Sequence, residues 1–159
     1  MIKTFVAALA VSLIGPVAAL AQSCSVDRVD IRQNGVVASF AVEIADDFEE
    51  RSRGLMFVES IPQFSGMLFL YQDGPRRRSF WMRNTLIPLD MLFISETGEV
   101  RDIHENAVPL DETPIPSETD DIVAVLEING GLSAMLRFEP GAEIRHPAFN
   151  GPDAVWACD

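Results

Sequence analysis

Apolar and polar residues alternate along residues 29–32 and 36–44, which is the pattern of β-strands. Val29 and Ile31 share one face of the first run, and the charged residues beside them occupy the other face. Asn34-Gly35 joins the two runs, and this pair is typical of a tight hairpin turn. The folded part of the chain is therefore predicted to begin with a β-hairpin.

Most later apolar runs are continuous, which is typical of strands buried on both faces. We expect strands at residues 67–71, 79–82, 89–94, 99–103, 122–128 and 142–145. Short turns separate most of them, so neighbouring strands should run antiparallel. The acidic, proline-rich segment 109–121 has no apolar periodicity and is predicted to be a surface loop.

Two short helices are expected between the strands. Asp46 and Glu49 have the spacing of a capping box at the start of the first helix, and Gly54 is placed to end it. The second helix is expected at residues 132–137. Together these elements predict a β-rich α+β domain, a largely antiparallel curled sheet or partial barrel with two short helices.

The first residues, 1–21, have the three parts of a secretory signal peptide. Lys3 precedes an apolar run over residues 5–14, and Ala19-Leu20-Ala21 fits the small-residue cleavage pattern. The run is shorter than the roughly 20 apolar residues that span a bilayer. We therefore expect cleavage after Ala21, which leaves residues 22–159 as a single globular domain, periplasmic or secreted and without a transmembrane span.

Cys24 and Cys158 lie near the two ends of this mature chain. In an oxidising compartment the pair predicts one disulfide that ties the termini together. A redox or metal-binding pair is the alternative, but the two residues lack CxxC spacing and nearby histidines. Lipidation of Cys24 is also disfavoured, because Ala21 stands where a lipidated cysteine is expected to have a large aliphatic residue.

An excess of acidic residues gives the chain a formal net charge of −12. Such a surface repels the phosphates of nucleic acids and anionic lipids, so we expect no nucleic-acid partner. The basic run Arg76-Arg77-Arg78 is either a solvated loop or a contact for an anion or an acidic partner, and both interpretations stay open. The methionines lie in apolar segments, which favours core packing over Cu(I) binding. His104 and His146 lack ligand spacing, so no metal and no other cofactor is expected.

Several segments follow one another in the order of a known family. They are Gly54-Leu55-Met56, residues 66–69, residues 80–94, Leu126-Glu127 before Gly130, and Pro140-Gly141. With these segments, the chain resembles the domain of unknown function 192 family over residues 36–146; the family comprises small bacterial and archaeal proteins, secreted or membrane-linked. The resemblance implies a compact β-rich fold. It implies no reaction, because the family has no established one.

Two carboxylates lie inside strongly apolar strands, Asp90 in one and Glu127 in another. A buried carboxylate must be paired, hydrogen-bonded or protonated. One interpretation is a structural ion pair between Asp90 and Arg83, which lies one loop earlier. The other is acid–base chemistry by the carboxylates, one of them with a raised pKa.

The segment 81–85 is the favoured functional surface. Strand alternation places Trp81 and Arg83 on one face, where an aromatic plane and a guanidinium can hold a ring, a sugar or an anion. Phe80 and Met82 would then fill the core. The candidate ligand-binding residues are Trp81, Arg83, Asn84, Thr85, Asp90 and Glu127.

These residues favour a non-catalytic binding or accessory module for a small molecule, glycan or protein, because no catalytic nucleophile is recognisable. The alternative is a small hydrolase-like enzyme that uses Asp90 or Glu127 with Arg83.

Export makes a direct prediction about the mature chain. The intact mass of the exported product should correspond to a chain that begins at Gln22, because cleavage is expected after Ala21. Mass spectrometry of the product from the periplasm or medium measures this. A product that retains Met1, or one that begins at a lipid-modified Cys24, would contradict the expectation.

Overall fold

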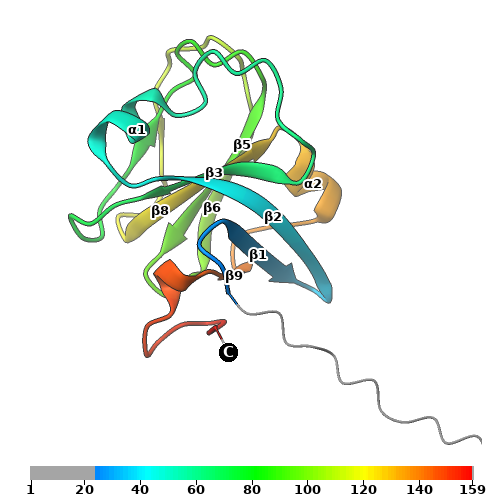
Figure 1. Ribbon diagram of the computed structural model, residues 1–159, viewed down its shortest axis with the longest axis vertical. Helices are drawn as coiled ribbons and strands as arrows, with labels where there is room; N and C mark the ends of the chain where they lie inside the picture. Colours follow the sequence, from blue (N-terminus) through cyan, green and yellow to red (C-terminus); the bar gives the residue numbers. More distant parts are fainter. Residues whose placement is uncertain (1–23, 159) are drawn as a thin grey trace, which may run out of the picture.

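A strongly curled β-sheet organises the chain (Figure 1). The computed structural model describes residues 24–158, so the predicted signal peptide lies outside the described residues. The sheet has the strand order β6-β5-β8-β3-β2-β1-β9. These strands are β1 (Arg28–Gln33), β2 (Val36–Ala45), β3 (Ser65–Leu70), β5 (Leu89–Ser95), β6 (Val100–Ala107), β8 (Ile122–Asn129) and β9 (Glu143–Arg145). A bridge between Glu99 and Glu143 joins the two edges at one end, so the sheet forms a half-barrel, and the β-rich fold predicted from the sequence is confirmed.

Strands β1 and β2 form the expected hairpin. Asn34 and Gly35, which connect them, have φ angles of 50° and 81°. Positive φ at both central residues is what a two-residue turn of this type requires. The hairpin therefore follows directly from the Asn-Gly pair in the sequence.

Helix α1 (Phe48–Arg53) begins one residue later than the expected capping box implies. Its N-cap is Asp47, whose side chain accepts a hydrogen bond from the backbone N–H of Glu50. The Glu50 carboxylate in turn accepts from the backbone of Asp47. The capping box is thus Asp47–Glu50 rather than Asp46–Glu49, because the chain is still extended at Asp47, with ψ of 173°.

Strands β2 and β3 run parallel, unlike the other paired strands of this sheet. A parallel pair needs a crossover connection, and the segment that contains α1 supplies it. Leu55, just after α1, is buried in the core on one face of the sheet. The crossover therefore fixes α1 on that face.

The segment 109–121 is more ordered than expected. It contains strand β7 (Ile115–Pro116), which pairs with β4 (Ser79–Phe80) in a separate two-stranded sheet. Regular strand structure stops at Phe80, short of the expected end at residue 82. This small sheet was missed because a two-residue strand is too short to show a periodic pattern.

The two ends of the described chain are joined as predicted. Cys24 and Cys158 form a disulfide. Just before it, the 3₁₀ helix η1 (Pro147–Phe149) lies in the C-terminal tail, and Phe149 packs into the core. None of the helices in residues 24–158 has the length and apolar content needed to cross a membrane.

The sheet has a core on each face. The first core includes Phe40, Leu68, Leu92, Leu126, Leu132, Phe138 and Ile144, with helix α2 (Leu132–Leu136) on its side of the sheet. The second core includes Leu55, Phe69, Met82, Met91, Phe93 and Val125. Strands β5 and β8 contribute to both cores, because successive side chains of a strand point to opposite faces. A polar side chain in the middle of either strand is consequently buried whichever way it points, as Asp90 and Glu127 are.

Candidate functional site

Glu127 is a buried acid without a partner. It lies in β8, between Met67 of β3 and Met91 of β5, and only 5% of the residue is exposed. Its carboxyl group has no hydrogen-bond or ion-pair partner within residues 24–158. Burial raises the pKa of Glu127 to about 8. The group is therefore largely protonated at neutral pH, when it can donate a hydrogen bond as well as accept one.

Glu127 lines a cavity of about 100 Å³. The walls come from α1 and the residues after it, from β3 and its end, and from β4 and the loop that follows. The lining residues are Arg51, Ser52, Arg53, Gly54, Leu55, Met56, Phe69, Tyr71, Ser79, Phe80, Trp81, Thr85 and Glu127. Because one water molecule occupies about 30 Å³ in the liquid, this volume corresponds to about three water molecules. The cavity therefore has room for one small chemical group of a ligand but not for a whole sugar ring.

Gly54 allows α1 to lie close to β3. It ends the helix with φ of 49°, and its N–H donates to the carbonyl of Glu50. A Cβ atom at this position would lie 3.2 Å from the Phe69 ring, which is closer than ordinary packing. Glycine thus satisfies both the backbone angle and the close approach, and it brings the end of α1 to the cavity.

Aromatic rings form the inner wall of the cavity. Phe80 meets Phe69 edge to face with ring centroids 5.1 Å apart, and it meets Phe93 in the same way at 6.2 Å. Such contacts stabilise a fixed ring geometry in addition to burying apolar area. They hold β4 against the sheet, so that Trp81, which is 44% exposed, lies where the cavity opens to solvent.

Two guanidinium groups line this cavity, those of Arg51 and Arg53, and a third, that of Arg83, lies beside it on Trp81. Arg51 lies over the Tyr71 ring, 5.2 Å from its centroid, and Arg83 lies over the Trp81 ring at 5.4 Å. Arg53 is exposed at the end of α1. Arg51, Arg53 and Arg83 have no carboxylate partner among the described residues. These guanidinium groups are therefore not neutralised by a direct ion pair, although the chain as a whole is strongly acidic.

Tyr71 is held by a further arginine. The guanidinium of Arg78 lies 3.8 Å from the centre of its ring and forms an ion pair with Asp73 at 2.6 Å. Burial raises the pKa of Tyr71, while Arg78 and Arg51 oppose that rise and Glu127 adds to it. At neutral pH, Tyr71 is thus a neutral hydroxyl on the cavity wall.

The structure brings several of the predicted site residues together. Met82 is fully buried and Trp81 is exposed, so the expected alternation along this segment is confirmed. Thr85 is buried and lines the same cavity as Trp81 and Glu127. Asn84 has φ of 55°, and its carbonyl accepts a hydrogen bond from a neighbouring loop, so it shapes the segment.

Asp90 lies apart from this group. Its carboxylate accepts hydrogen bonds from the backbone N–H groups of Asn106, Gly131 and Ser133, each at 2.7 Å. Two of these donors belong to the start of α2, whose N-cap Gly131 has no side chain to offer. Asp90 therefore serves as the acceptor that a capping side chain would otherwise supply.

The expected ion pair between Arg83 and Asp90 is wrong for the described chain. The register pairs Met91 with Glu127 and Asp90 with Ile128, so the side chains of Asp90 and Glu127 point to opposite faces of the sheet. Arg83 lies over the ring of Trp81, and Trp81 lines the cavity of Glu127. For the same reason, Asp90 and Glu127 cannot act as a pair of carboxylates on one substrate.

Sequence reasoning missed the part of the site that α1 provides. No motif in the sequence distinguishes Arg51 and Arg53 from the charges of a solvated helix face, because their position against β4 depends on the crossover from β2 to β3. One signal was present: Gly54-Leu55-Met56 belongs to the segments that carry the family resemblance.

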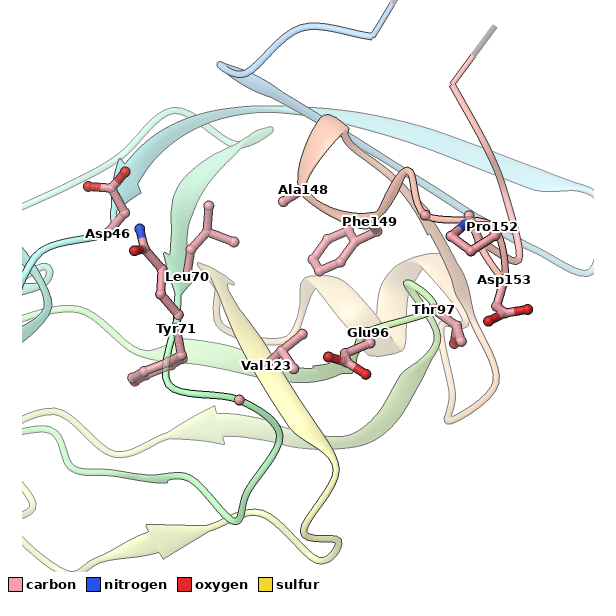
Figure 2. Close-up of a pocket in the computed structure, with 14 residues that line it drawn as sticks. Asp46, Leu70, Tyr71, Glu96, Thr97, Val123, Ala148, Phe149, Pro152 and Asp153 are labelled. Atoms are coloured by element: carbon pink, nitrogen blue, oxygen red, sulfur yellow. The ribbon is translucent and has the colours of Figure 1, made fainter.

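A second, larger cavity of about 550 Å³ lies where the C-terminal tail meets the ends of β3 and β8 (Figure 2). Leu70, Val123 and Phe149 give it apolar walls, and Figure 2 shows Asp46 at one end and Asp153 at the other. None of the site residues predicted from the sequence lines it. The tail that completes it had no recognisable pattern in the sequence.

These features define a class of protein: a β-rich half-barrel with a recessed acid in a small cavity between its helix and its sheet. Residues 29–146 match the model of the DUF192 family, described as uncharacterized ACR, and the chain belongs to this family. A search of curated proteins finds no match.

Two solved structures are similar to the chain. One is a protein of unknown function from Novosphingobium aromaticivorans DSM 12444, with 42% identity and a TM-score of 0.71, covering 74% of this chain and 82% of that one. The other, from Sinorhizobium meliloti 1021, is described provisionally as a transcription regulator. It has 39% identity and a TM-score of 0.72, covering 77% of this chain and 95% of that one.

The contacts of Asp90 and Arg83 predict unequal effects on stability. Asp90→Ala removes the acceptor of three backbone N–H groups, one buried and two part-buried, and should lower the free energy of unfolding by on the order of 3 kcal/mol or more. Arg83→Ala removes one exposed cation–π contact and should cost less than about 1 kcal/mol. Urea unfolding of both variants measures the difference. A larger loss for Arg83→Ala than for Asp90→Ala would refute this assignment.

The raised pKa of Glu127 predicts a specific dependence of stability on pH. The native state binds the proton of the Glu127 carboxyl group more tightly than the unfolded state does, because the pKa of this group is about 8 in the native state and near 4.5 in the unfolded state. The stabilising contribution of the protonated group is therefore complete below about pH 4.5 and is lost as the pH rises towards 8. Glutamine does not titrate, so this pH dependence of the free energy of unfolding should be absent in Glu127→Gln.

Unfolding in urea at about pH 5 and about pH 8.5 tests this dependence. Relative to Glu127→Gln, the native protein should lose up to a few kcal/mol of stability across the interval. Glu43→Gln is the control, because Glu43 is exposed on β2 and should follow the native protein. Equal pH slopes for all three proteins would show that Glu127 does not titrate in this range.

Proposed function

We propose that this chain is an exported, non-catalytic binding or accessory domain that holds a small polar ligand in the cavity lined by Glu127. One observation carries the proposal: Glu127 is buried, has no partner within residues 24–158, and lines a cavity. The carboxyl group faces the cavity, and burial separates it from most of the surrounding water. A ligand that enters the cavity could therefore hydrogen-bond to it.

The surroundings of Glu127 suit a ligand that is partly apolar and partly hydroxylated. Thr85 and Ser79 supply hydroxyl groups on the wall, and the neutral carboxyl group can act as donor or acceptor. The exposed ring of Trp81 offers a flat surface on which a sugar or other ring can stack. A small molecule or one residue of a glycan would place a single group inside and leave its remainder over Trp81.

An enzymatic role is the second candidate, and one observation favours it. A carboxyl group with a pKa of about 8 suits a general acid at neutral pH. Hydrolysis by two carboxylates needs a second acid on the same side of the substrate. Asp90 does not meet this requirement, because it faces the other core and accepts three backbone hydrogen bonds. Binding is therefore preferred over catalysis.

The proposed location is the periplasm or the extracellular medium. The signal-peptide pattern of residues 1–21 and the disulfide between Cys24 and Cys158 support it. The provisional role of the Sinorhizobium meliloti protein as a transcription regulator is not extended to this chain. A net charge of −12 opposes contact with the phosphates of DNA.

Ligand-observed NMR with a panel of monosaccharides and small hydroxylated metabolites tests the proposal on the mature chain. A ligand of the site should lose at least tenfold in affinity in Glu127→Gln and in Trp81→Ala, and should bind Glu43→Gln as it binds the native protein. Circular dichroism confirms that the variants are folded. Ligands that bind all variants equally would refute the site, and turnover of a bound glycoside would favour the enzymatic candidate instead.

A further inference from the structure

The charge around the opening of the Glu127 cavity narrows the class of ligand. Arg51, Arg53 and Arg83 have no carboxylate partner within residues 24–158. The guanidinium of Arg51 donates to the carbonyls of Asp46 and Leu70, whereas no hydrogen bond or ion pair of the Arg53 or Arg83 guanidinium is found within residues 24–158. Arg51 and Arg53 line the cavity and Arg83 lies over the ring of Trp81, which also lines it, so guanidinium groups without a carboxylate partner lie on and beside the cavity.

We infer that the site selects an anionic sugar, a sugar acid or a sugar phosphate, whose anionic group lies against Arg53 and Arg83 while a hydroxyl group enters the cavity and hydrogen-bonds to Glu127. This inference rests on the proposed function of the same site. Guanidinium groups are complementary to carboxylates and phosphates, because they carry the opposite charge and can donate two parallel N–H hydrogen bonds to two oxygens. The cavity volume of about 100 Å³ accepts a hydroxyl or hydroxymethyl group, and the sugar ring stays outside over Trp81.

A cationic ligand fits the same site less well. Its charge would have to pass the guanidinium groups at the opening before it reached Glu127. The acidic character of the whole chain does not remove this barrier, because exposed charges beyond about 8–10 Å are screened at physiological ionic strength. A neutral sugar could occupy the cavity, but it would leave Arg53 and Arg83 without a partner.

The second cavity provides an internal contrast. Asp46, Glu96 and Asp153 line it, and none of the three forms an ion pair among the described residues. An anionic sugar should therefore avoid that cavity although it is larger. Binding of such a ligand reports on the Glu127 site specifically.

Isothermal titration calorimetry on the mature chain can test the inference with five probes: glucuronate, galacturonate, glucose 6-phosphate, glucose and glucosamine. At least one anionic sugar should bind tenfold or more tightly than glucose and glucosamine. Arg53→Ala and Arg83→Ala should each weaken that binding at least fivefold, while Arg53→Lys should keep most of it. Arg137→Ala is the control, because Arg137 is exposed at the end of α2 and belongs to neither cavity.

The outcomes separate this inference from the proposed function. If glucose or glucosamine binds as tightly as the anionic sugars and the binding is lost in Glu127→Gln, the site stands and the selectivity for anions is refuted. If no probe binds, the selectivity for anionic sugars is refuted, and the wider NMR panel still decides the proposed function. If a probe binds and its binding is unchanged in Glu127→Gln, both are refuted. Anionic selectivity that depends on Arg53, Arg83 and Glu127 together supports both.

Discussion

The curl of the sheet is the constraint on which the other features depend. The bridge between Glu99 and Glu143 joins the outer strands at one end, and the curled sheet then carries a packed core on each face. Strands β5 and β8 lie between those cores and have no face in water, as their almost wholly buried residues show. Every polar side chain in these strands must therefore find a partner inside the protein or be protonated.

Asp90 and Glu127 meet this constraint in opposite ways. Asp90 points to the face where α2 begins, and three backbone N–H groups donate hydrogen bonds to its carboxylate. Glu127 points to the face where α1 and β4 lie, and no donor among the described residues reaches it. Asp90 thereby fixes the start of α2, and Glu127 is left beside a cavity without a hydrogen-bond partner among the described residues. The fold uses the first for stability and gives up some stability at the second.

The fold alone does not decide the function. The chain shares its architecture with family members for which no activity is established, so only the residues of the site can indicate a function. Here the local charge differs from the global charge. The chain is strongly acidic, yet the opening beside Trp81 is lined by guanidinium groups without carboxylate partners. At the distances over which a small ligand is bound, the local groups dominate because distant charges are screened.

The sequence by itself determined the features that depend on neighbours along the chain. The Asn34-Gly35 turn, the alternation of Trp81 and Met82, and the buried strands follow from local backbone angles and a period of two residues. The terminal disulfide followed from the number and placement of the cysteines. Which side chains meet was decided by the tertiary structure. The opposed faces of Asp90 and Glu127, and the contact of α1 with the cavity, depend on strand register and on the crossover from β2 to β3. Strand register and the crossover bring together segments that lie far apart in the chain. No local sequence pattern encodes which of these segments meet.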